Sequence, residues 1–244
     1  MTALAAESLH PSIWRASQLA RSDARCIDTG HAVLSAQLPG GWPVGTLIEL
    51  LTQQPGIGEL RLLAPILAKV SKSGIVMLEP PHAPQITAFA GLGIAPAHLT
   101  WIRSGRGTAD ALWAAEQVLR SGCYGAVCFW QKQMRPESLR RLNLAAQQGE
   151  TLFFTFRPLA AAQDASPAPL RLALRPASGG VDIEIVKRRG PARDEHIFLP
   201  LSVPGVAPSL PSQRKPVDRP LPVEATTTER VEVTATERAA DVVW

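Results

Sequence analysis

Short apolar runs alternate with segments of helical periodicity through much of this chain. The apolar runs predict β-strands at residues 47–51, 74–79, 99–103, 126–130 and 151–156. Between them, apolar residues at helical spacing, bounded by Gly or Pro, predict helices at 58–72, 84–92, 109–120 and 136–149. This alternation predicts an α/β fold whose central sheet is mostly parallel and is flanked by helices.

The pattern changes beyond residue 156. Apolar runs at 170–175, 181–188 and 196–201 follow one another with Ser-Gly-Gly and Gly-Pro turn sequences between them, which predicts a C-terminal antiparallel extension. Six prolines between residues 204 and 222, and a polar stretch that runs on to Trp244, then leave little to bury. We therefore expect an N-terminal helical segment (1–26), an α/β domain (27–203) and a Pro-rich disordered tail (204–244).

Composition places these elements in a globular protein of ordinary size. The 244 residues are 45% hydrophobic, which is enough for one substantial core. The overall charge is +4, and residues 204–244 contribute −1, so the globular part carries the positive charge. No apolar run reaches the roughly 20 residues of a membrane span and the N-terminus lacks a signal-peptide core, so we expect a cytoplasmic location.

The three cysteines fit neither a disulfide framework nor a zinc pattern, and the surroundings of Cys123 and Cys128 predict buried, reduced thiols.

The most informative segment joins the first of these strands to its helix. Residues 49–63 contain a strand, a glycine turn and a helix start, which is the order found in a Walker A loop, G-x-x-x-x-G-K-[ST]. Such a loop holds phosphate with its amides and its lysine, and its hydroxyl holds magnesium. Here Glu59 and Leu60 follow Gly58, and we expect a carboxylate at the helix entrance to repel an anion. The segment predicts a degenerate phosphate-binding loop with Gly56, Gly58, Glu59 and Leu60 as remnant positions.

Further segments carry a family resemblance that spans most of residues 27–200. They are Thr-Gly followed by Leu at 29–34, Gly-Gly-Trp-Pro-Val-Gly at 40–45, Glu-Pro-Pro-His at 79–82, Arg-Ser-Gly at 120–122, Phe-Arg-Pro-Leu at 156–159 and Val-Lys-Arg-Arg-Gly at 186–190. The first four resemble the RecA core. The last two resemble the ImuA family, and so does Pro-Gly-Ile-Gly-Glu-Leu-Arg-Leu-Leu at 55–63. The members of this family are RecA-like accessory proteins of bacterial translesion DNA synthesis and are often labelled SulA-like. The resemblance implies a RecA-like core.

The resemblance also implies that the residues with which RecA hydrolyses ATP are replaced. The phosphate-loop lysine and threonine fall on Glu59 and Leu60, the water-activating glutamate on Pro81, and the aspartate that ends the Walker B strand on Trp130. The glutamine that senses the γ-phosphate falls near Arg157. Pro81 offers no base and Leu60 no metal ligand. We expect no enzymatic activity, no catalytic residues, no cofactor and no metal site.

Basic residues lie near the positions where RecA has its DNA-contacting loops, although the matching intervals here are short. The candidates for contact with a partner or with DNA are Lys132, Arg135, Arg140, Arg141, Arg157, Lys187, Arg188 and Arg189. They predict either weak, sequence-independent nucleic-acid binding or solvated faces and salt bridges with a partner. Lys187 and Arg189, two apart on a predicted strand, would point to one face, and in the resembled fold the matching pair reaches across a protomer interface. Trp14, in the N-terminal segment, is a further candidate for an interface, including self-association, or for packing on the core.

By resemblance, the expected function is that of a non-catalytic mutasome component in SOS-induced translesion synthesis after DNA damage. The implied partners are RecA, an ImuB-like protein and, through it, an error-prone polymerase and the sliding clamp. Two alternatives remain open. One is a SulA-type cell-division inhibitor that binds FtsZ. The other is a noncanonical DNA-stimulated ATPase, against which Glu59 and Pro81 argue.

Overall fold

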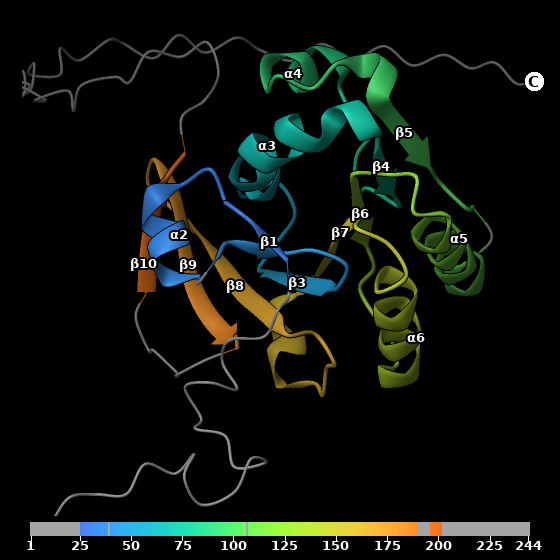
Figure 1. Ribbon diagram of the computed structural model, residues 1–244. Helices are drawn as coiled ribbons and strands as arrows, with labels where there is room; N and C mark the ends of the chain where they lie inside the picture. The colour runs from blue at the N-terminus through green and yellow to red at the C-terminus, as the bar shows by residue number, and fades with distance from the viewer. Residues whose placement is uncertain (1–24, 39, 106, 190–195, 202–244) are drawn as a thin grey trace, which may run out of the picture. The chain divides into compact units, whose positions relative to one another are not determined.

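An eight-stranded sheet forms the centre of the fold (Figure 1). The computed structural model describes residues 25–38, 40–105, 107–189 and 196–201; Trp14, nearly all of the predicted segment 1–26 and the predicted tail 204–244 lie outside them. The strand order is β10-β9-β8-β3-β7-β6-β4-β5. The strands are β3 (Leu47–Thr52), β4 (Ile75–Leu78), β5 (Leu99–Ile102), β6 (Ala126–Trp130), β7 (Leu152–Pro158), β8 (Leu170–Ala177), β9 (Gly180–Lys187) and β10 (His196–Pro200).

The sheet is mostly parallel, as the alternating pattern predicts. Strand β3 pairs in parallel with β7 on one side and with β8 on the other, and β6, β4 and β5 continue the parallel set. The antiparallel extension is confirmed for β8, β9 and β10 among themselves. However, β8 also belongs to the parallel set, because the chain crosses from β7 over β3 before the extension begins.

Helices cover both faces of the sheet. Helices α2 (Ala32–Gln37), α3 (Glu59–Val70) and α4 (Ile86–Gly91) pack on one face, in a core that includes Leu34, Leu63 and Phe89. Helices α5 (Thr108–Ser121) and α6 (Pro136–Ala146) lie side by side on the other face, over a core that includes Phe129 and Phe153 (Figure 1). The two-stranded pair of β1 (Cys26–Ile27) and β2 (Trp42–Pro43) and the 3-10 turns η2 (Ser71–Ser73), η3 (Pro96–His98) and η4 (Leu159–Gln163) complete the described elements.

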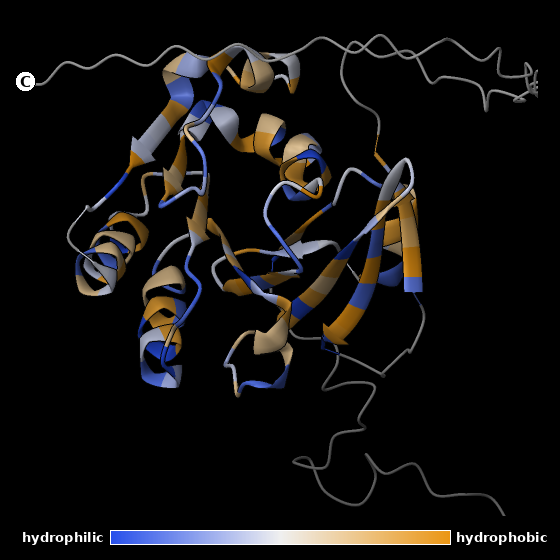
Figure 2. Ribbon diagram, turned by 180° about the vertical axis from the view of Figure 1, so that it is seen from behind, coloured by the Kyte–Doolittle hydropathy of each residue, from blue (hydrophilic) through white to orange (hydrophobic). Residues whose placement is uncertain are grey.

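The pattern of buried positions differs between the central and the outer strands. Every residue of β3 is buried, because β3 has neighbours on both edges and packed side chains on both faces. Strand β10 instead alternates between exposed and buried positions, although one exposed position is the apolar Phe198. Figure 2 shows blue and orange bands along the other strands of the antiparallel extension. Gly122, with φ of 61°, ends α5, and Pro136 begins α6 at its first turn. None of the helices in the described ranges is both long and apolar enough to span a bilayer.

The strand bounds and the exposure of the cysteines show that two sequence-based expectations are wrong. Strand β9 ends at Lys187, so Arg188 and Arg189 lie beyond it, and strand alternation does not place Lys187 and Arg189 on one face. Cys123 is exposed rather than buried, because it follows the last residues of α5 in the turn before β6, whereas Cys128 within β6 is fully buried.

Candidate functional site

The glycine loop, residues 53–58, leads from the end of β3 to the first turn of α3. Gly56 and Gly58 adopt φ of 84° and 118°, the left-handed region in which a side chain is strained. Glu59, the first residue of α3, is 4% exposed. Its Oε1 accepts a hydrogen bond from the Gly56 amide at 2.8 Å, and its Oε2 accepts one from the Gly58 amide at 3.1 Å. The carboxylate therefore lies on the loop's own amides, where the helix dipole favours negative charge.

This arrangement changes the expectation for Glu59. The sequence predicts a carboxylate that faces an incoming anion and repels it. In the structure the carboxylate turns back and bonds the loop amides, so it competes with any other anion for the same donors. Leu60 is half-buried and packs against the core, where it presents no polar atom.

A cleft of about 760 Å³ opens beside this loop, at the carboxyl ends of β3, β4, β6 and β7. Its walls come from five segments: the end of β3 and the residues after it (52–55), Glu79 and Pro81 after β4, the glycine-rich loop before α5 with the start of that helix, the end of β6 and the residues after it (130–132), and residues 156–158 of β7. Open α/β sheets bind their ligands at this edge, beyond the carboxyl ends of the strands. The cleft is thus a candidate binding site by position as well as by size.

Two features shape the cleft wall. Trp130 stacks on Phe156, with ring centroids 4.2 Å apart and an interplanar angle of 8°. Glu79 has φ of 54°, a strained value for a residue with a side chain, and its Oε1 accepts a hydrogen bond from the Ser104 amide. The sequence identified Trp130 as a remnant position but gave no sign of the stacking or of the strain at Glu79, since both depend on neighbouring strands.

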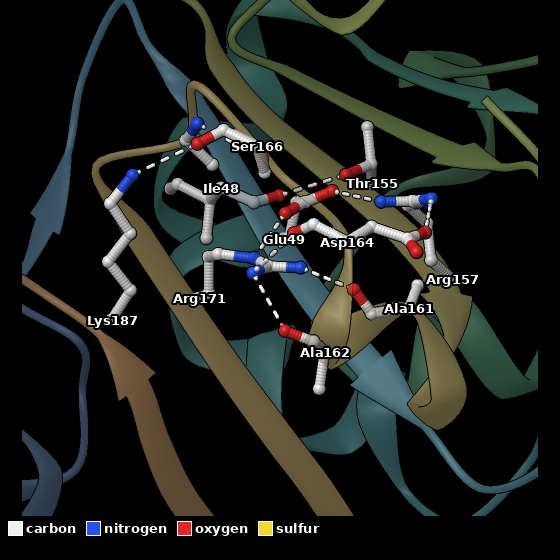
Figure 3. A network of polar contacts seen from close by, with 11 residues as sticks. Ile48, Glu49, Thr155, Arg157, Ala161, Ala162, Asp164, Ser166, Arg171 and Lys187 are labelled. Atoms are coloured by element: carbon white, nitrogen blue, oxygen red, sulfur yellow. Dashed lines mark hydrogen bonds and ion pairs between the residues drawn. The ribbon is translucent and has the colours of Figure 1, made fainter. Parts of the chain in front are cut away.

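A buried ion network lies beneath the cleft and centres on Glu49 of β3 (Figure 3). Arg157 of β7 donates to Glu49 Oε1 at 2.8 Å, and Arg171 of β8 donates to Glu49 Oε2 at 2.6 Å. Arg157 also pairs with Asp164 at 2.9 Å. Arg171 donates to the carbonyls of Ala161, Ala162 and Asp164 at 2.6, 3.1 and 3.2 Å. The network holds η4, the turn that carries the chain over β3, against three strands.

Arg157 must therefore be removed from the surface cations predicted to contact DNA or a partner. Its side chain is 2% exposed, and its guanidinium is committed to Glu49 and Asp164. A buried arginine that pairs with two carboxylates is held by the fold and cannot reach a phosphate backbone.

The other predicted cations do not form one cluster through their contacts. Lys132 is exposed and lines the cleft, and Arg135 and Arg140 are exposed at the start of α6 and on it. Arg141 pairs with Glu116 of α5. Lys187 donates to the Ser166 carbonyl at 3.0 Å (Figure 3), and Arg188 donates to the carbonyl of Gln37, the last residue of α2. Burial raises the pKa of the Cys26 thiol, and the positive charge of Arg189 acts in the opposite direction.

The described part of the cleft is suited to hydrogen bonding and stacking. It combines the Glu79 carboxylate, the Lys132 ammonium, side-chain amides such as that of Gln131, and the stacked Trp130.

Among the residues that the structure describes, no group of three or more His, Cys, Asp or Glu side chains lies close enough to hold a metal ion. Comparison of the chain with protein-family models and with curated proteins finds no match.

Proposed function

We propose that this chain is a non-catalytic, RecA-like accessory protein of SOS-induced translesion DNA synthesis, with an inactive phosphate-binding loop. The observation that carries the non-catalytic part of the proposal is the position of the Glu59 carboxylate on the Gly56 and Gly58 amides, and the role in translesion synthesis follows from the resemblance to the ImuA family. In an active loop of this type those amides bind phosphate. A carboxylate already bonded to them would have to be displaced before a nucleotide could bind, and it would then lose both hydrogen bonds.

Three other residues support the loss of catalysis. Leu60 stands where a magnesium-binding hydroxyl is needed, and its side chain packs on the apolar core. Pro81, at the cleft wall, has no group that accepts a proton from water. Trp130 ends β6 and stacks on Phe156 where an acidic residue is needed. Under this proposal the protein acts by contacts with RecA and an ImuB-like protein and, through the latter, with an error-prone polymerase and the sliding clamp.

The first experiment titrates the purified full chain with labelled ATP and magnesium, with and without single-stranded DNA, and follows binding and phosphate release together. RecA measured in parallel is the positive control. We expect neither saturable binding nor release above the buffer background. Saturable binding with DNA-stimulated turnover would overturn the non-catalytic assignment, and the chain would then be a noncanonical ATPase.

The second experiment tests the partners. Purified RecA filaments on single-stranded DNA, a purified ImuB-like protein and purified FtsZ are each titrated with the full chain. We expect saturable binding to RecA or the ImuB-like protein, and no change in the GTPase rate of FtsZ. Inhibition of that GTPase without binding to the other two would replace the proposal with a division-inhibitor function.

A further inference from the structure

The chain leaves the sheet at the edge where the cleft opens. Strand β10 runs in the same direction as β3, because β8 is parallel to β3, β9 is antiparallel to β8, and β10 is antiparallel to β9. The carboxyl end of β10 therefore lies at the same edge of the sheet as that of β3. Leu201 directly follows β10 and is the last described residue. The segment after Leu201 thus starts at the edge of the cleft.

The contacts of Leu201 place this starting point beside the glycine loop. Leu201 is 6% exposed, and a methyl group added to Gly58 would lie 2.8 Å from its Cδ1 atom. Arg61 of α3 donates to the Leu201 carbonyl at 3.5 Å. Pro55, which lines the cleft, precedes Gly58 by three residues, and three residues of chain span at most about 11 Å. Leu201 therefore lies close to the cleft wall.

The other long segments outside the described ranges start at the opposite edge. Arg25 pairs with Glu150, which precedes β7, and its carbonyl accepts a hydrogen bond from the Val44 amide, which precedes β3. The chain before Arg25 therefore joins the domain at the amino ends of the parallel strands. Residues 190–195 connect the carboxyl end of β9 to the amino end of β10, which is the same edge. Of these segments, only the one after Leu201 starts beside the cleft.

The cleft carries no net charge that would select an ion. Among the described residues that line it, Glu79 and Lys132 are oppositely charged, and Arg157 is already paired with two carboxylates. The Trp130 indole Nε1 is buried and has no hydrogen-bond acceptor. The cleft therefore favours an uncharged, largely apolar occupant that supplies an acceptor. The residues that provide its apolar wall are Pro55, Pro81, Ala111, Trp130, Phe156 and Pro158.

Residues 202–208, which we call the exit segment, have this character. Their sequence is Ser-Val-Pro-Gly-Val-Ala-Pro, which is mostly apolar and contains no charged side chain. Proline favours an extended backbone whose carbonyls are free to accept hydrogen bonds, and proline-containing segments bind to aromatic-lined grooves. At about 3.1 Å a residue, seven residues span about 22 Å. This length exceeds the distance to Pro55 and leaves residues to cross the cleft.

We propose that the exit segment occupies the cleft of its own chain. Its valine and proline side chains cover the apolar wall. Its backbone carbonyls accept hydrogen bonds from the Trp130 indole and from side-chain amides such as those of Gln54 and Gln131. Because the segment is attached at Leu201, its effective concentration is high and it needs no high intrinsic affinity. Any other ligand of the cleft has to displace it. This inference does not depend on the proposed function, since it requires no partner.

The first test places a photo-crosslinking residue at position 206 of the full chain, and at position 231 as the control. Dilute protein is irradiated, and mass spectrometry identifies the attached residues. We expect position 206 to attach within its own chain to residues 52–55, 130–132 or 156–158, and position 231 to attach there about tenfold less often or not at all. Attachment of position 206 to other parts of the domain, or mainly to a second copy, overturns the proposal.

The second test needs no bulky residue in the exit segment. Val206→Glu places a charge in that segment, and Val231→Glu places the same charge further along the chain. Hydrogen exchange at the amides of Gln54, Gln131 and Lys132 should be about fivefold faster or more in Val206→Glu, and should change less than about twofold in Val231→Glu. Equal exchange in the two variants overturns the proposal. Urea denaturation verifies that both variants are folded.

Neither test uses RecA or the ImuB-like protein. Failure of this inference therefore leaves the proposed function intact, and failure of the proposed function leaves this inference intact.

Discussion

The Arg157 guanidinium lies 2.8 Å from the Glu49 carboxylate, and both side chains are almost completely buried between β3 and β7. Removing one partner of a buried ion pair leaves an uncompensated charge. We expect Arg157→Ala to lower the free energy of unfolding by about 3–5 kcal/mol, measured by urea denaturation. Arg140→Ala, at an exposed cation on α6, should change it by less than about 0.5 kcal/mol. Equal stability of the two variants would show that Arg157 is not held as described.

Glu59 and Glu137 provide a second comparison, because each lies in the first turn of its helix. Glu59 is bonded to two loop amides, whereas Glu137 is exposed. We expect Glu59→Ala to cost about 1.5–3 kcal/mol of stability, and Glu137→Ala a few tenths. Inorganic phosphate should raise the melting temperature of Glu59→Ala more than that of the wild type, since it can occupy the vacated amides. A phosphate response in the wild type alone would contradict this reading of the loop.

The pH dependence of stability should contain a contribution from Glu116. Hydrogen bonding by Arg141 and the charge of Arg120 hold the pKa of this carboxyl below its ordinary value, although burial acts in the opposite direction. A lowered pKa in the folded state stabilises the fold above the unfolded value of about 4.3, and this stabilisation is lost as the pH falls through the folded pKa. The difference in unfolding free energy between wild type and Glu116→Gln should be constant near neutral pH and shrink below about pH 4.3. A difference that does not change with pH would exclude this role for Glu116.

The cysteines should differ in reactivity. Cys123 is exposed, whereas burial raises the pKa of the Cys128 thiol and, more modestly, that of Cys26. Because the thiolate is the reactive form, a disulfide reagent such as dithionitrobenzoate should modify Cys123 first and Cys128 only after unfolding. Cys123→Ser should remove the fast phase of the reaction. Retention of that phase would place the reactive thiol elsewhere.

The sequence predicted the element order well because burial on both faces leaves a clear local pattern. Strand β6 matches its predicted range of 126–130, and α5 differs from its predicted range by one residue at each end. The parallel pairing of β8 with β3 could not be predicted in this way. It brings together residues that are far apart in the chain, such as Arg171 and its partner Glu49, which are 122 positions apart.

The candidate site was predictable only in part. The spacing of Gly56 and Gly58 identifies the loop. It does not predict that the Glu59 carboxylate accepts hydrogen bonds from the loop amides, because the direction of this side chain depends on its torsion angles. Arg157 was grouped with the surface cations because a lone arginine after an apolar run gives no local sign of a buried carboxylate partner. The cleft itself was not predicted, since its walls come from five separate segments of the chain.

The hydrogen bonds from the loop amides to Glu59 have a consequence for how the loop responds to free anions. A loop that binds a free anion is occupied to an extent that depends on the concentration of that anion. The loop after β3 carries its anion covalently, as the side chain of the next residue, at an effective concentration that does not vary. Its Gly56 and Gly58 amides therefore have an acceptor whatever the concentration of free anions, and the shape of the loop should not depend on that concentration.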